Sequence, residues 1–145
     1  MEEIKVVIDD GGYMPERAHD LDAGYDIRTP YDIIVPPSTP QGGAGKAFVD
    51  TGIHIQIPAG YAGLLVSKSG LNVVHNITGT GLIDAGYTGS IAVKLYNHGA
   101  KEWPIKRGEK LIQLVIIPVA TPDLVRVSEL AETDRGAAGF GSTGR

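Results

Sequence analysis

The sequence predicts an all-β fold, and three observations support that prediction. Apolar and polar residues alternate along several short segments, as expected for strands with one buried face. Glycine accounts for 20 of the 145 residues, about twice its usual share, which favours turns over a helical bundle. Turn signals rich in glycine, proline and asparagine separate the apolar segments. Together these features are typical of a β-sandwich, a barrel or a jelly roll.

The expected strands follow one another closely. The clearest alternation covers 90–97, where Ile91, Val93 and Leu95 share one face. The apolar segment 110–118 is long enough for a strand that is buried on both faces. In chain order the strands are expected at 4–8, 25–28, 31–35, 47–51, 53–57, 63–67, 90–97 and 110–118, with one short helix at 69–75.

The end of the chain differs in composition from the rest. Residues 132–145 are rich in glycine and contain one large apolar side chain, Phe140. Such a segment buries too little to order itself, so we expect a single β domain over 1–131 and a flexible C-terminal tail over 132–145. Composition alone does not decide between a disordered end and a flexible lid over a ligand. Glycine-rich ends are commonly disordered, whereas Arg135 and Phe140 are a cation and an aromatic that a merely solvated segment does not need.

Composition and charge exclude several classes of protein. With 13 basic and 17 acidic side chains the net charge is −4, and no run of Lys or Arg offers a nucleic-acid surface. The absence of cysteine excludes disulfides, thiolate nucleophiles and cysteine-ligated metals. The longest apolar run, 114–120, is too short to span a membrane, and the first residues do not resemble a signal peptide. We therefore expect a soluble, cytoplasmic protein that binds neither nucleic acid nor membrane.

Two glycine motifs are rejected because their context is wrong. Residues 139–144 match G-x-G-x-x-G, but no strand and helix follow them before Arg145. Residues 42–47 are similar to a phosphate-binding P-loop, but Pro40 stands where the first glycine belongs and Ala47 replaces the hydroxyl residue.

Three other segments combine small residues with isolated reactive side chains. The segment 22–27 places acids among residues suited to a strand. The segment 67–71 offers a cation, two hydroxyls and a backbone amide at a strand end, which suits phosphate oxygens. Four glycines among the eleven residues of 79–89 permit a hairpin that closely approaches a ligand, and Asp84 could act there as a general base. Taken singly, each segment also fits an ordinary turn or surface loop.

Taken in order, five segments resemble the motifs of the homotrimeric dUTPases (deoxyuridine triphosphate nucleotidohydrolases). They span nearly the whole chain, and the first and fifth are the most diagnostic. The resemblance implies a dUTPase-like jelly roll, a homotrimer with active sites at its subunit interfaces, and hydrolysis of dUTP to dUMP and pyrophosphate with Mg²⁺. The five segments are 23–27, 67–71, 81–89, 107–114 and 135–144.

The resemblance also implies roles for individual residues. Asp84 would activate the water that attacks the α-phosphorus, and Asp26 would contact the metal through water. The backbone between Thr78 and Ile83 would read uracil, and Tyr87 would pack on the deoxyribose. The implied substrate-binding residues are Lys68, Ser69, Gly70, Thr78, Gly81, Leu82, Ile83, Tyr87, Gln113, Arg135, Phe140, Gly141 and Ser142.

Two other functions are possible on the same fold. The dCTP deaminases share the Asp-x-Gly-aromatic pattern at Asp84, but they need a glutamate ten residues further on, where Lys94 stands here. A regulatory or interaction protein built on the dUTPase trimer would tend to lose Asp84 or the C-terminal segment, and both are present. Three positions depart from the family pattern. Lys68 stands where arginine is usual, and Gly86 and Ser90 stand where acids are common.

Overall fold

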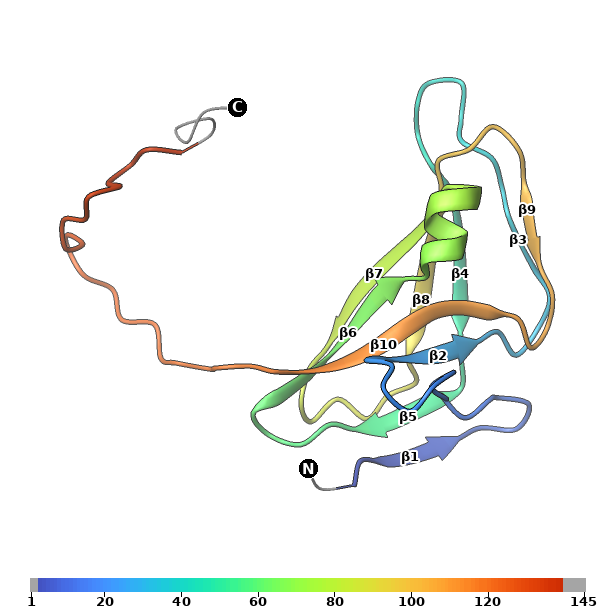
Figure 1. Cartoon of the computed structure of the whole chain (residues 1–145), viewed down its shortest axis with the longest axis horizontal. Helices are drawn as coiled ribbons and strands as arrows, with labels where there is room; N and C mark the ends of the chain where they lie inside the picture. The colour runs from blue at the N-terminus through green and yellow to red at the C-terminus, as the bar shows by residue number, and fades with distance from the viewer. Residues whose placement is uncertain (1–2, 140–145) are drawn as a thin grey trace.

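The computed structural model describes residues 3–139. Within them, antiparallel strands curl around one apolar core, and the last part of the chain leaves that core as an extended arm (Figure 1). The elements are β1 (Lys5–Ile8), β2 (Gly24–Arg28), β3 (Ile33–Val35), β4 (Gly45–Asp50), β5 (Ile53–Gln56), β6 (Tyr61–Ser67), the π-helical turn η1 (Gly70–Val74), β7 (Ile77–Ile83), β8 (Ala92–Asn97), β9 (Trp103–Ile105) and β10 (Lys110–Pro118). The curled, almost helix-free sheet agrees with the predicted jelly roll.

The main sheet has six strands in the order β2-β10-β6-β7-β8-β4, and β1–β5 and β3–β9 form two further pairs. β10 lies between β2 and β6, with Gln113 opposite Asp26 on one side and Val66 on the other. None of its residues from Lys110 to Ile117 is exposed, which confirms the expected strand with two covered faces.

The predicted alternation along 90–97 is confirmed. Ile91, Val93 and Leu95 are all buried, whereas Ala92 and Lys94 between them are exposed. These inward side chains join aliphatic residues from the rest of the main sheet and from the two strand pairs, so the core consists almost entirely of Ile, Leu and Val.

The glycine-rich segment 79–89 was expected to form a hairpin, and its first part lies in a strand that the sequence did not predict. Residues Ile77–Ile83 form β7, which pairs antiparallel with β6 and with the next strand, β8, so the segment connects the two strands of a hairpin. A Cβ atom on Gly79 would lie 3.0 Å from the Lys94 carbonyl oxygen, and one on Gly81 would lie 3.1 Å from Leu65 Cδ1. Glycine here allows close approach inside a strand rather than a turn.

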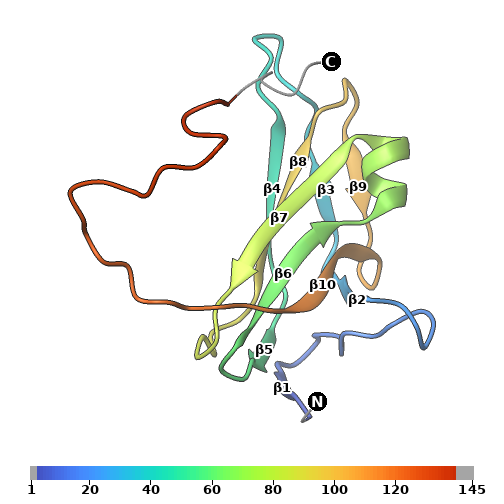
Figure 2. The same cartoon turned by 60° about the vertical axis from the view of Figure 1, so that its left-hand side comes forward.

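The arm begins directly after β10. From Thr121 to Gly139 every residue is exposed, including Leu124 and Leu130, and Figure 2 shows this segment running well clear of the sheet. The predicted boundary at residue 132 falls within it. Among residues 3–139, no helix is long and apolar enough to cross a membrane.

Candidate active site

A buried carboxylate with two lysines marks one end of the main sheet. Asp26, on β2, has a side chain only 5% exposed, and it accepts hydrogen bonds from Lys68 Nζ at 2.5 Å and from Lys110 Nζ at 2.6 Å. Burial alone would raise the pKa of Asp26, but the two lysine hydrogen bonds and charges outweigh it and hold that pKa below its usual range. Two ammonium groups against one carboxylate leave this cluster with a net positive charge.

An open hollow of about 530 Å³ adjoins the lysines. Its wall carries the positive charges of Arg28, Lys68 and Lys110 and the negative charge of Glu109. Gly70 also lines it. Ser69 and Gly70 are exposed where β6 gives way to η1. Cations and a free polypeptide backbone in this arrangement suit an anionic ligand such as a phosphate chain.

Ser67, the last residue of β6 and the neighbour of Lys68, connects β6 to β7 through its hydroxyl. Its hydroxyl donates to the Gly79 carbonyl at 3.0 Å and accepts from the Gly79 N–H at 2.9 Å. Gln113 lies on the neighbouring β10, where its side chain fills the space that a Cβ on Gly24 would need. The structure thus brings together Asp26, Lys68, Ser69, Gly70 and Gln113, five of the residues expected at the site.

Asp84 and Tyr87 lie at the opposite end of β7, in the loop 84–91, which we call the active-site loop. Asp84 is exposed, and its carbonyl accepts from the Tyr87 N–H at 3.2 Å. The Tyr87 hydroxyl donates to the Ser90 carbonyl at 3.0 Å. A Cβ on Gly89 would lie 2.5 Å from that hydroxyl oxygen, so a larger residue there would displace the tyrosine ring from this position.

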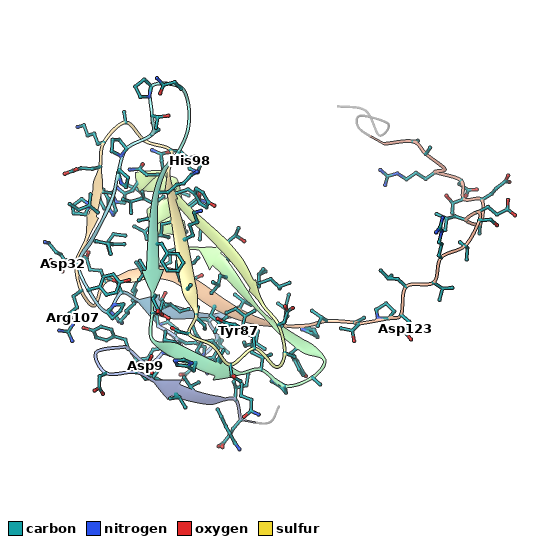
Figure 3. All side chains as sticks on the ribbon, turned by 180° about the vertical axis from the view of Figure 1, so that it is seen from behind. Asp9, Asp32, Tyr87, His98, Arg107 and Asp123 are labelled. Carbon is teal, nitrogen blue, oxygen red and sulfur yellow. The ribbon has the colours of Figure 1, made fainter. Side chains whose placement is uncertain are left out.

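The two ends lie well apart within a single chain. Gly79 contacts Ser67 at one end, and Asp84 follows five residues later along an extended strand. At about 3.4 Å per residue the separation is about 17 Å. Figure 3 shows the same arrangement, with Tyr87 and His98 at opposite ends of the strands.

The strand between these ends offers backbone groups along one side. β8 pairs with β7 only from Ile77 to Gly79, whereas β6 pairs with it from Thr80 to Ile83. From Thr80 onward, β7 is thus paired on a single side. The expected uracil-reading residues Gly81, Leu82 and Ile83 lie on this stretch. Thr78 lies beside it, with its Oγ1 2.8 Å from His98 Nε2.

Of the C-terminal residues of the expected site, the structure describes Arg135. Arg135 lies in the exposed arm, where its Nε donates to the Ala138 carbonyl at 3.0 Å. Phe140, Gly141 and Ser142 lie outside the described residues.

Sequence reasoning missed Lys110 and Trp103. Lys110 belongs to one of the five matching segments, but its partner becomes visible only in the pairing of β10 with β2. Trp103 stacks on His75, with ring centroids 3.7 Å apart, and both line the hollow beside the lysines. No sequence spacing signals that contact.

The residues described provide no protein cage for a metal. Within 3–139, no group of three or more His, Cys, Asp or Glu side chains is placed to hold an ion. Both oxygens of Asp26 already accept from lysines. This donor set fits a cation that arrives on a phosphate chain and keeps most of its water, as Mg²⁺ commonly does.

Comparison with known proteins gives a consistent result. A family model described as dUTPase matches residues 10–144. The chain is 41% identical over 132 residues to the deoxyuridine 5'-triphosphate nucleotidohydrolase of Arabidopsis thaliana, covering 90% of this chain and 76% of that protein. It is 40% identical over 139 residues to the nucleotidohydrolase of the same name from Tropheryma whipplei strain Twist, covering 93% and 91%.

Solved structures give the same picture. The dUTPase of Staphylococcus bacteriophage 80alpha with dUPNHPP superposes with a TM-score of 0.89 at 32% identity, over 100% of both chains. A variant dUTPase of phage phi11 of S. aureus superposes with a TM-score of 0.78 at 31% identity, over 90% of this chain and 100% of that one. That second structure concerns the coordination of a structural Mg(II) ion.

Proposed function

The chain belongs to the dUTPase family and is a dUTP diphosphatase, and on that premise we propose how its residues divide the reaction. The end of the sheet with Asp26, Lys68 and Ser69 binds the phosphates, and the active-site loop of another subunit supplies the chemistry. The observation that carries this division is the separation of about 17 Å between the two ends along β7.

We propose that the chain completes its sites as a homotrimer. Cyclic assembly can place the phosphate end of one subunit against the active-site loop of its neighbour, and so completes three equivalent sites. The exposed arm supports this assembly, since Leu124 and Leu130 are 97% and 87% exposed and gain a favourable environment only by packing on another surface.

At the phosphate end, backbone and hydroxyl groups of Ser69 and Gly70 bind phosphate oxygens, with Gln113 beside them. Lys68 and Lys110 act mainly through their charge, because Asp26 fixes their ammonium groups at 2.5 and 2.6 Å. Lysine in place of arginine at position 68 keeps the charge and gives up the two-pronged geometry of a guanidinium. Arg135 and residues 140–142 reach the phosphates and the base from the arm.

At the other end, Asp84 orients a water molecule and accepts its proton. The water oxygen forms a bond to the α-phosphorus as the bond between that phosphorus and the bridging oxygen breaks. Pyrophosphate leaves with the bonding electron pair, and dUMP remains. Tyr87 packs on the deoxyribose, and the singly paired edge of β7 over 80–83 reads uracil through its backbone.

Mg²⁺ bound to the triphosphate would neutralise negative charge on it and favour departure of pyrophosphate. Asp26 would hold the ion only through water, because both its carboxylate oxygens accept from lysines.

The test is an assay of purified protein with dUTP, dCTP and dTTP in the presence of Mg²⁺, following pyrophosphate and ammonia separately. Pyrophosphate from dUTP, with little product from the other two nucleotides, is the expected result. Ammonia from dCTP would replace this proposal with deamination. Light scattering on the same sample should give the mass of three chains, and full activity from a monomer would refute the division of the site.

A further inference from the structure

The active-site loop is tied at its far end to the turn between β4 and β5. Ser90 Oγ donates to the Asp50 carboxylate and accepts from the Gly52 N–H at 3.0 Å. The hydrogen bond from Ser90, followed by one that the Gly52 N–H donates to Asp50 Oδ1 at 3.3 Å, holds the pKa of Asp50 below its usual range. The Ser90 hydroxyl thus joins the loop to the turn.

His54, on β5, holds the middle of the same loop. Its Nδ1 lies 2.7 Å from the Thr88 carbonyl oxygen, and its Nε2 lies 3.1 Å from Asp9 Oδ2. Both partners are hydrogen-bond acceptors. A neutral imidazole carries one N–H and can satisfy only one of them, whereas the imidazolium carries two. Only the imidazolium can therefore donate to both acceptors at once.

Asp9, whose carboxylate contacts His54 Nε2, is held in place by Gly52. Its N–H donates to the Gly52 carbonyl at 2.9 Å, and its side chain rests against Gly52, where an added Cβ would lie 3.2 Å from Asp9 Cβ. Gly52 has a φ of +67°, a conformation that favours glycine. The turn that anchors Ser90 thus also positions the carboxylate that holds His54.

The charges around His54 favour its cation. Asp9 faces it from the end of β1 and Asp50 from the end of β4, while Lys5 lines the same hollow with opposing charge. The hydrogen bond to the Thr88 carbonyl, followed by that to Asp9, raises the pKa of His54 above its ordinary 6.5. The clamp is therefore complete below about pH 6.5 and is lost as pH rises through the folded-state pKa.

We propose that His54, as its imidazolium, is a positioning residue for dUTP hydrolysis: it clamps the active-site loop through Thr88 so that Asp84 and Tyr87 meet the nucleotide correctly. Loss of its proton frees one of the two contacts and loosens the loop. The inference rests on the roles proposed above for Asp84 and Tyr87.

The first test follows the ring itself. Protein containing isotope-labelled histidine is titrated by NMR, with His54 assigned by comparison with His54→Gln and with the exposed control His19→Gln. We expect His54 to titrate above pH 6.5, and Asp9→Asn to lower its midpoint. The protection of the Thr88 and Gly89 amides from exchange, relative to their intrinsic exchange rate at each pH, should fall over the same pH interval in the wild type. A His54 midpoint at or below pH 6.5 would refute the proposed clamp. So would amide protection at Thr88 and Gly89 that does not change around that midpoint.

The second test measures kcat and KM against pH. At about pH 6, Asp9→Asn should have the wild-type kcat. As the pH rises, its kcat should decline at a lower pH than the wild-type kcat does, because His54 loses its proton at a lower pH without the Asp9 carboxylate. His54→Gln should show a two- to tenfold lower kcat, about the effect of one hydrogen bond, with little change in KM and without the alkaline decline assigned to His54. His19→Gln should match the wild type throughout.

The two tests separate the clamp from the function on which it rests. An unchanged alkaline decline in His54→Gln refutes the positioning role even if the protein hydrolyses dUTP well. A wild-type protein that does not hydrolyse dUTP refutes the proposed function, while the titration and amide exchange still report whether His54 holds the loop.

Discussion

Replacing Asp26 by asparagine removes the single negative charge between Lys68 and Lys110 and should destabilise the fold. Breaking a fully buried ion pair by removing one partner typically costs about 3–5 kcal/mol. The lysine side chains here are 22% and 35% exposed and can turn partly into water, so we expect about 2–4 kcal/mol at pH 7.

The assay is urea unfolding of both proteins at one fixed concentration, because an oligomer's midpoint depends on concentration. The pKa of Asp26 is lowered in the folded state from 3.8. Its contribution is therefore fully present above that value and is lost as pH falls through the folded-state pKa. The difference between wild type and Asp26→Asn should accordingly be constant near neutrality and shrink as the pH falls below about 4.

Asp32→Asn is the matched control. Asp32 also pairs with a lysine, Lys106, at 3.1 Å, but its side chain is 61% exposed, so the urea midpoint should move far less. If Asp26→Asn unfolds within about 0.5 kcal/mol of the wild type at pH 7, the buried pairing contributes little and our reasoning from burial is wrong.

Three further predictions concern the strand, the loop and the arm. Gly79→Ala should lower the thermal midpoint clearly, because its Cβ would lie 3.0 Å from the Lys94 carbonyl oxygen, whereas Gly70→Ala meets no atom within 4 Å and should change it little; equal midpoints would contradict the close-packing argument. Asp84→Asn should fold normally, bind nucleotide and lose about 10²–10⁴-fold in kcat, and near-normal turnover would remove Asp84 from the reaction. Arg135→Ala should lower kcat/KM about tenfold to a hundredfold without changing thermal stability, and an unchanged kcat/KM would leave the arm without a catalytic part.

The sequence predicts strands where a buried face enforces alternation, and it is less informative where glycine replaces that pattern. The segment around Ile91 and Val93 was predicted correctly because period-two burial leaves a direct trace. β7 was missed as a strand because Gly79 and Gly81 look like turn residues until their close neighbours are known.

The candidate site was predicted as a set of residues but not as an arrangement. Matching segments identified Asp26 and Asp84, yet nothing in their spacing shows that they lie at opposite ends of the sheet. The partner of Lys110 and the His54 contacts arise between strands that are distant in sequence. Such contacts depend on register, which a single sequence does not display.

The placement of the two half-sites at opposite ends of β7 has a genetic consequence. One variant defective at Ser69 and another defective at Asp84 would each be inactive alone, yet mixed trimers would restore intact sites wherever a sound phosphate end meets a sound loop. Random assembly of equal amounts should return about a quarter of the wild-type activity. In a cell that carries both alleles, two damaged copies of the gene would therefore complement each other.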